Sequence, residues 1–331
     1  MAISTVLFST DPWHHIAAFQ DGVPQDMAPF VKQTTISAHD AYYEDRLLAW
    51  ATALHTVLAP WYATYGHARL PYLVECLPHM RDLVLLDAIY TNDVTLLRHL
   101  HDQLDLVRGS SSRLLNVAAK RGHLEIVAYL HAMDHASCKV FGAMNLAARN
   151  GHLEVVQFLH THREEGCDRR AMTDAAANNH LHVVEWLHVH RKEGCSSDAL
   201  TLAASHGHLD MVQWLLAHRR EGKPTQAMLK AIQGNHLAVM KYLEPHVPTD
   251  VKVSTVVVDA LVSTGALSML EWLHTSRHKI ELTHHAMVLA ARHGQLAVLQ
   301  WLHDDVGVAC PPGLEEVAAG HDDILDYLVC C

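Results

Sequence analysis

The chain has 331 residues, of which 50% are hydrophobic and 18% charged, a composition that indicates a folded protein with a large core. The formal net charge of −11 with neutral histidines disfavours nucleic-acid binding. No apolar run is long enough to cross a membrane and no signal peptide is recognisable, so the sequence predicts a cytoplasmic or nuclear protein. Its seven cysteines are then expected to be free thiols.

Residues 1–79 carry helix signals without a repeat. A Ser-Thr-Asp-Pro sequence predicts a short helix over 13–20, and residues 24–32 suit a second one. The mixed apolar and polar pattern of residues 38–65 predicts a long helix. We expect the whole segment to form a helical cap over the hydrophobic end of residues 80–331.

Over residues 80–331 one phrase recurs: two small residues, two variable ones, Gly or Asn, then usually His and Leu, a hydrophobic stripe and an aromatic residue. The Gly or Asn positions, 26 to 30 residues apart, are Asn92, Gly122, Gly151, Asn179, Gly207, Asn235, Gly265, Gly294 and Gly320. A tandem period of this size is typical of a stacked array. The sequence therefore predicts nine units.

Each unit has the pattern of two helices joined by a tight turn. In the third unit, Leu153, Val156 and Leu159 give the second helix an apolar face, and the small residues of the first helix let the two approach closely. The Gly or Asn between them suits a left-handed backbone. A further Gly, at 166 and 194, suits the position directly after the second helix. These features predict an all-α helical solenoid in which neighbouring units bury one another's faces.

The recurring phrase resembles the ankyrin repeat. The runs Ala-Ala-x-x-Gly-His-Leu-(Glu/Asp)-x-Val that carry the resemblance lie at 118–127, 147–156 and 203–212. The resemblance implies an ankyrin-like solenoid that binds another protein on its concave face. The units are shorter than the 33 residues of that family and lack its Thr-Pro-Leu-His opening, so we expect trimmed β-turn fingers. Shortened, His- and Trp-rich repeats are similar to arrays abundant in water moulds and giant viruses.

The resemblance also selects candidate partner-binding residues, because the two variable positions of the phrase lie at the exposed end of the concave wall. These residues are Lys120, Arg121, Arg149, Asn150, Asn178, His206, Gln233, Arg292 and His293. A mildly basic wall in an acidic chain favours an acidic or polar segment of another protein as partner. We expect a monomeric scaffold; a solvated face that binds nothing is the alternative.

The thirty histidines follow the repeat, which favours structural roles over chemistry. Those after the turn, such as His152, are predicted to hydrogen-bond loop carbonyls of the neighbouring unit. Cys138, Cys167 and Cys195 share one repeat position, as small buried residues or, alternatively, as part of a metal site. No phosphate loop, hydrolase elbow or zinc-protease motif occurs, so we expect no enzymatic activity, metal or cofactor. Since histidine titrates near 6.5, stability should fall between about pH 7 and 5.

Both ends of the chain leave a second interpretation open. Residues 7–19 resemble the opening of an F-box, which would imply a substrate-recognition adaptor of a ubiquitin ligase in place of a simple cap. The terminal Cys330-Cys331 resembles the prenylation site of Rab-type small GTPases, with an unmodified tail as the alternative.

Overall fold

The computed structural model describes residues 24–33, 44–104, 111–133, 142–248, 251–276 and 280–329. The F-box-like segment 7–19, the helix expected over 13–20, Cys138 and the terminal Cys330-Cys331 lie outside the described residues, so the predictions made for them stay predictions. Every regular element of the described residues is a helix, which confirms the all-α fold class.

Four helical elements of the described residues precede the array: η1 (Gln25–Phe30), α3 (Glu44–Tyr65), η3 (His67–Arg69) and α4 (Leu70–Cys76). Nine helix pairs come next within the described ranges, as the period predicts. In chain order they are α5 (Met80–Tyr90) with α6 (Val94–Leu104), α7 (Ser111–Arg121) with α8 (Leu124–Met133), α9 (Ala143–Arg149) with α10 (Leu153–His162), α11 (Arg169–Ala177) with α12 (Leu181–His190), α13 (Asp198–Ser205) with α14 (Leu209–His218), α15 (Pro224–Gln233) with α16 (Leu237–Leu243) and the short η4 (Glu244–His246), α17 (Thr255–Thr264) with α18 (Leu267–Thr275), α19 (His284–Arg292) with α20 (Leu296–Asp304), and α21 (Leu314–Val317) with α22 (Asp322–Val329).

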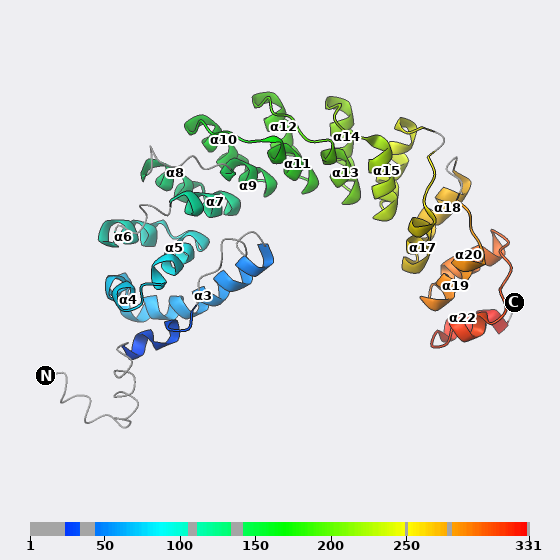
Figure 1. The fold of residues 1–331 in the computed structure, drawn as a ribbon, viewed down its shortest axis with the longest axis horizontal. Coiled ribbons are helices and arrows are strands. Elements are labelled where there is room, and N and C mark those ends of the chain that lie inside the picture. Colours follow the sequence, from blue (N-terminus) through cyan, green and yellow to red (C-terminus); the bar gives the residue numbers. More distant parts are fainter. Residues whose placement is uncertain are drawn as a thin grey trace, which may run out of the picture. The chain divides into compact units, whose positions relative to one another are not determined.

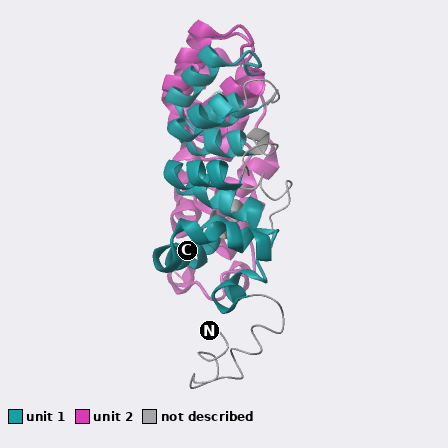
Figure 2. Ribbon diagram, turned by 90° about the vertical axis from the view of Figure 1, so that its left-hand side faces the viewer, with its two compact units in different colours: residues 1–167 teal, residues 168–331 magenta. Residues whose placement is uncertain are grey.

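The chain forms two compact units, residues 1–167 and 168–331, shown in teal and magenta in Figure 2. In the first, α5 packs on α7 and α7 on α9, while α8 packs on α10 (Figure 1). In the second, the odd-numbered helices from α11 to α21 pack in succession. Each unit therefore has a layer of first helices, which we call the first-helix layer, and a layer of second helices. The predicted boundary between cap and array at residues 79 and 80 stays a prediction.

The turn inside every pair has the left-handed backbone that the sequence predicts. All nine turn residues have positive φ, between 69° and 99° for the glycines and between 58° and 62° for the asparagines. In the third pair the His152 amide donates to the Ala147 carbonyl (2.9 Å) and the Gly151 amide to that of Ala148 (3.1 Å), a Schellman closure. His152 is also the N-cap of α10, so one tight turn ends a helix and starts the next.

The core follows from the small and aliphatic positions of the phrase. Ala147 and Ala148 on α9 are fully buried, as are Val155, Val156 and Leu159 on α10 to within 2%. Alanines at the helix crossing let the two backbones approach, and the aliphatic face of the second helix fills the space between neighbouring pairs. The fold therefore needs the stack, because a single pair would leave this face in water.

The connections between pairs are tight loops with a local ion pair. In the loop after α10, the Arg163 guanidinium donates to the Glu165 carboxylate at 2.7 Å, and Gly166 follows with a φ of 67°. The expectation that this glycine directly follows the helix is wrong, because α10 ends at His162 and Arg163 is already extended. The described loops contain no strand, in agreement with the expected trimming of the β-turn fingers.

The N-terminal elements pack against the first pair. η1 occupies part of the stretch expected to be a short helix, and its Phe30 ring meets Trp61 of α3 edge-on at 5.8 Å. Asp26 of η1 accepts hydrogen bonds from Arg69 at 2.7 and 3.0 Å. α3 packs on α5, and the capping role expected for residues 1–79 stays a prediction.

We expect Gly207→Ala to destabilise the array by about 2–4 kcal/mol, since it adds a clash to the roughly 1 kcal/mol strain of a left-handed alanine. A Cβ on Gly207 would lie 2.5 Å from the His236 ring of the next pair. The matched control is Gly320→Ala, because Gly320 has the same turn position but nothing within 4 Å of its Cβ site. Urea unfolding midpoints measure both. Equal losses would contradict the packing of the histidine on the glycine.

Candidate interaction surface

All nine candidate residues lie at the C-terminal ends of first helices. Arg121, Arg149, Gln233 and Arg292 are the last residues of α7, α9, α15 and α19, and Lys120 precedes Arg121. The remaining four, each a C-cap residue, are Asn150, Asn178, His206 and His293. The structure therefore places the set at one edge of the first-helix layer in each unit, and its role in partner binding stays a prediction.

In the first unit the candidates differ in how far they are engaged. The Arg121 guanidinium lies 4.4 Å from the centre of the Tyr90 ring, a cation–π contact with the preceding pair. Asn150 donates from Nδ2 to the Leu146 carbonyl at 2.8 Å, so its side chain caps α9. Arg149 is half-buried beside it. The Asn150 amide is therefore engaged by the fold, whereas Arg121 is exposed.

The second unit repeats this division. Asn178 caps α11 by donating to the Asp174 carbonyl at 2.8 Å. Gln233 accepts a hydrogen bond from Lys230 Nζ at 2.9 Å. His206 is exposed and its ring lies 5.8 Å from that of His208. Arg292 and His293 are also exposed.

In four pairs the histidine after the turn links its pair to the preceding one. The Nε2 atoms of His152 and His236 lie 3.0 Å from the carbonyl oxygens of Lys120 and Ser205. The same bond joins His208 to Ala177 (3.1 Å) and His321 to Arg292 (3.3 Å). A carbonyl only accepts, so Nε2 must carry the proton. These bonds confirm the predicted contact with loop carbonyls, and they fix the backbone from which candidate residues project.

Burial keeps several of these imidazoles neutral. Desolvation lowers the pKa of His123, His152 and His208 from its ordinary value near 6.5. The positive charge of Arg121 lowers the pKa of His123 and His152 further. The basic edge and the inter-pair hydrogen bonds are therefore coupled electrostatically.

A second set of histidines, at the ends of second helices, packs on the recurring aromatic residues. The His190 ring stacks on Trp186 at 4.3 Å with an interplanar angle of 14°, and its Nδ1 lies 2.9 Å from the Trp186 carbonyl. His188 meets Trp214 of the next pair edge-on at 5.2 Å. Both contacts are structural, and they cover the half-buried Trp and Tyr side chains.

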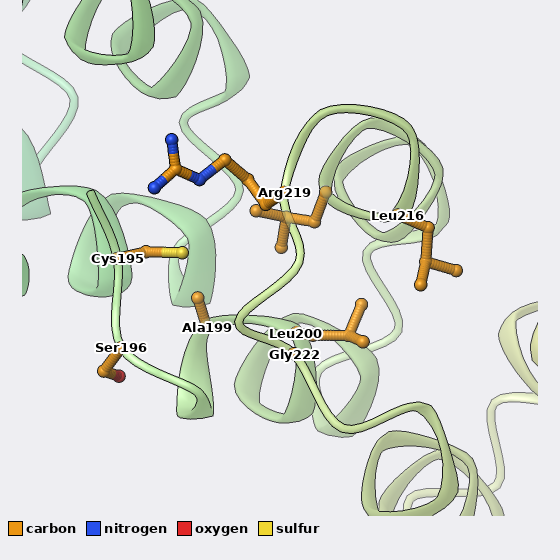
Figure 3. Close-up of a pocket in the computed structure, with 8 residues that line it drawn as sticks. Cys195, Ser196, Ala199, Leu200, Leu216, Arg219 and Gly222 are labelled. Atoms are coloured by element: carbon orange, nitrogen blue, oxygen red, sulfur yellow. The ribbon is translucent and has the colours of Figure 1, made fainter.

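Candidate groups for metal binding or nucleophilic chemistry are few among the described residues. No group of three or more His, Cys, Asp or Glu side chains among them could hold a metal ion. The Cys195 thiol points into a cavity of about 20 Å³, which has room for roughly one water (Figure 3). Cys195 is 4% exposed and burial raises its pKa, so it is a poor nucleophile. No helix of the described ranges is long and apolar enough to span a membrane.

One polar site was not found from the sequence. Asp87 on α5 is 1% exposed, and its Oδ1 lies 3.0 Å from Nδ1 of His55 on α3. Its second oxygen has no hydrogen-bond partner, and burial raises the pKa of Asp87. Desolvation likewise raises the pKa of the neighbouring Tyr62. The only sequence signal was an acidic residue in the apolar C-terminal part of a helix, at a position where Asp174 is half-exposed in a later pair.

Helix pairs with left-handed turns, stacked through small residues, define a helical repeat protein. Comparison with known families identifies the type of repeat. Residues 115–160 match a family model of ankyrin repeats (many copies), and residues 172–255 match one of ankyrin repeats (3 copies). The chain thus contains ankyrin repeats within residues 115–255, which confirms the resemblance. A search of curated proteins finds no significant match. Ankyrin repeats form a protein–protein interaction domain and are generally non-enzymatic.

We expect stability to fall as the pH drops below about 6.5. The unfolded chain takes up protons near that value, whereas the folded chain resists protonation of His123, His152 and His208, so acid favours unfolding. The chain supplies its own control: Gln295 occupies the histidine position and donates to the Ser263 carbonyl at 3.2 Å without titrating. His152→Gln with His208→Gln should therefore flatten the dependence of the urea midpoint on pH between 7.5 and 5.5. An unchanged slope would contradict this cause.

We expect His55→Ala to cost about 1–3 kcal/mol, because it leaves a buried carboxylate unpaired. Burial raises the pKa of Asp87 and so disfavours its charged form, and His55 offsets part of that cost. In an Asp87→Asn background the same substitution should cost less than about 1 kcal/mol. A double-mutant cycle by urea unfolding measures the difference. Equal costs in the two backgrounds would show that the pair is not coupled.

Proposed function

We propose that the chain is a non-enzymatic interaction scaffold that binds an acidic or polar segment of another protein on its first-helix layer, the concave face of the repeat array. The observation that carries this is the charge of α7 and α9. These two adjacent helices carry Lys120, Arg121 and Arg149 at their C-terminal ends and no acidic residue, in a chain whose net charge is −11. Such a patch attracts acidic partners and disfavours basic ones.

The candidate residues differ in whether the fold already uses their side chains. The amides of Asn150 and Asn178 donate hydrogen bonds that cap α9 and α11. Lys120, Arg121 and Arg149 are then the principal contacts in the first unit, and Arg292 with His293 in the second. A monomeric state and a cytoplasmic or nuclear location stay predictions from the sequence.

The test is charge reversal at the exposed end of α7 and α9. We expect Arg121→Glu with Arg149→Glu to reduce capture of partners in proximity labelling by about tenfold, since each close charge pair contributes on the order of 1 kcal/mol at a partly exposed site. The matched control is Arg98→Glu on α6, because Arg98 also lies over a tyrosine ring, Tyr129, at 5.7 Å, but in the second-helix layer. Equal labelling by all three proteins would remove this face as the binding surface.

A further inference from the structure

One position of the repeat marks the exposed surface of the first-helix layer. It lies five residues before each turn residue, and its nine occupants are Asp87, Val117, Leu146, Asp174, Leu202, Lys230, Ala260, Leu289 and Glu315. Eight of them are half-buried or exposed. The exception is Asp87, which is 1% exposed. Something covers the surface at the first pair that does not cover it at the others.

The cover is α3. Its residues Ala51, Leu54, Leu58 and Trp61, spaced three, four and three residues apart, form one apolar stripe and are no more than 5% exposed. α3 packs on α5, and His55 within the same stretch lies 3.0 Å from the Asp87 carboxylate. The first pair therefore already holds an amphipathic helix on this surface, with a polar contact from His55 to Asp87, while Trp61 at the end of the stripe packs on Phe30 of η1.

The next two pairs present the same surface with different chemistry. At the position of Asp87, α7 has Val117 and α9 has Leu146, both half-buried. The basic residues Lys120, Arg121 and Arg149 stand at one end of these helices, and neither helix carries an acidic residue. This surface is continuous with the one under α3, because α5 packs on α7 and α7 on α9.

We propose that α7 and α9 bind an amphipathic α-helix of a partner protein, which lies beside α3 and packs in the same way. Its apolar stripe, with spacings of three and four residues, contacts Val117 and Leu146. Acidic residues at its edge face Arg121 and Arg149. The inference rests on the function proposed above and names the conformation and chemistry of the ligand.

A helix fits this surface better than an extended peptide. An extended peptide gains most of its affinity by adding a strand to an exposed sheet edge, and the described ranges contain no strand to extend. A helix satisfies its own backbone hydrogen bonds and can pack on another helix through side chains alone. The packing of α3 on α5 is an instance of that arrangement within this chain.

The experiment selects ligands from a displayed library of random 16-residue peptides on the full-length protein, with negative selection on Leu146→Lys. Lysine is compatible with the position, since Lys230 occupies it in α15, and a circular-dichroism melt checks that the variant is folded. We expect enriched peptides with apolar residues three and four apart and acidic residues between them. Their Kd, measured by fluorescence anisotropy, should rise at least tenfold with Leu146→Lys and with Arg149→Glu.

The control is Leu202→Lys, which makes the same change at the same repeat position in α13 of the second unit. It should leave the affinity of the selected peptides unchanged. No enrichment, enriched peptides that contain proline or lack the spacing, or affinities insensitive to Leu146→Lys would overturn the inference. If partner labelling still depends on Arg121 and Arg149 in that case, the proposed function stands and only the helical ligand is wrong.

Discussion

The array depends on one local arrangement, a left-handed turn residue covered by a side chain from the next pair. A Cβ on Gly122 would lie 2.5 Å from Nδ1 of the His152 ring, which packs on the glycine. Nε2 of the same ring is 3.0 Å from the Lys120 carbonyl oxygen. A larger side chain at the turn would displace the ring and break the bond. Because the same contact recurs from pair to pair, it sets the distance at which neighbouring helices stack.

This arrangement explains which features were predictable. The nine Gly or Asn positions and the small residues beside them recur in register and have the expected roles, and four of the histidines after the turns, His152, His208, His236 and His321, make the expected contact with a carbonyl. Recurring residues are predictable because they serve a structural need that is the same in every pair. The loop glycine was misplaced because Arg163 becomes extended directly after α10 and pairs with Glu165, a contact that depends on side-chain geometry and not on helix-end preferences.

Features present only once were not predictable. Asp87 stands at a position that is polar or apolar in other pairs, and only the path of α3 makes it buried. Among the candidate residues, the sequence placed all nine at the helix ends but did not separate the capping Asn150 and Asn178 from the cationic groups. The distinction matters for the proposed function, because an amide that is already bonded to a backbone carbonyl is less available to a partner.

The most direct test of the inter-pair contact is the protonation state of the histidine rings, observed by long-range ¹H–¹⁵N correlation spectra at pH 7.5. We expect His152, His208, His236 and His321 to carry a proton at Nε2, with slowly exchanging ring protons for the more buried rings. Rings protonated at Nδ1, or averaging rapidly between the two tautomers, would show that these carbonyls are not their partners and would contradict a stack held by this contact.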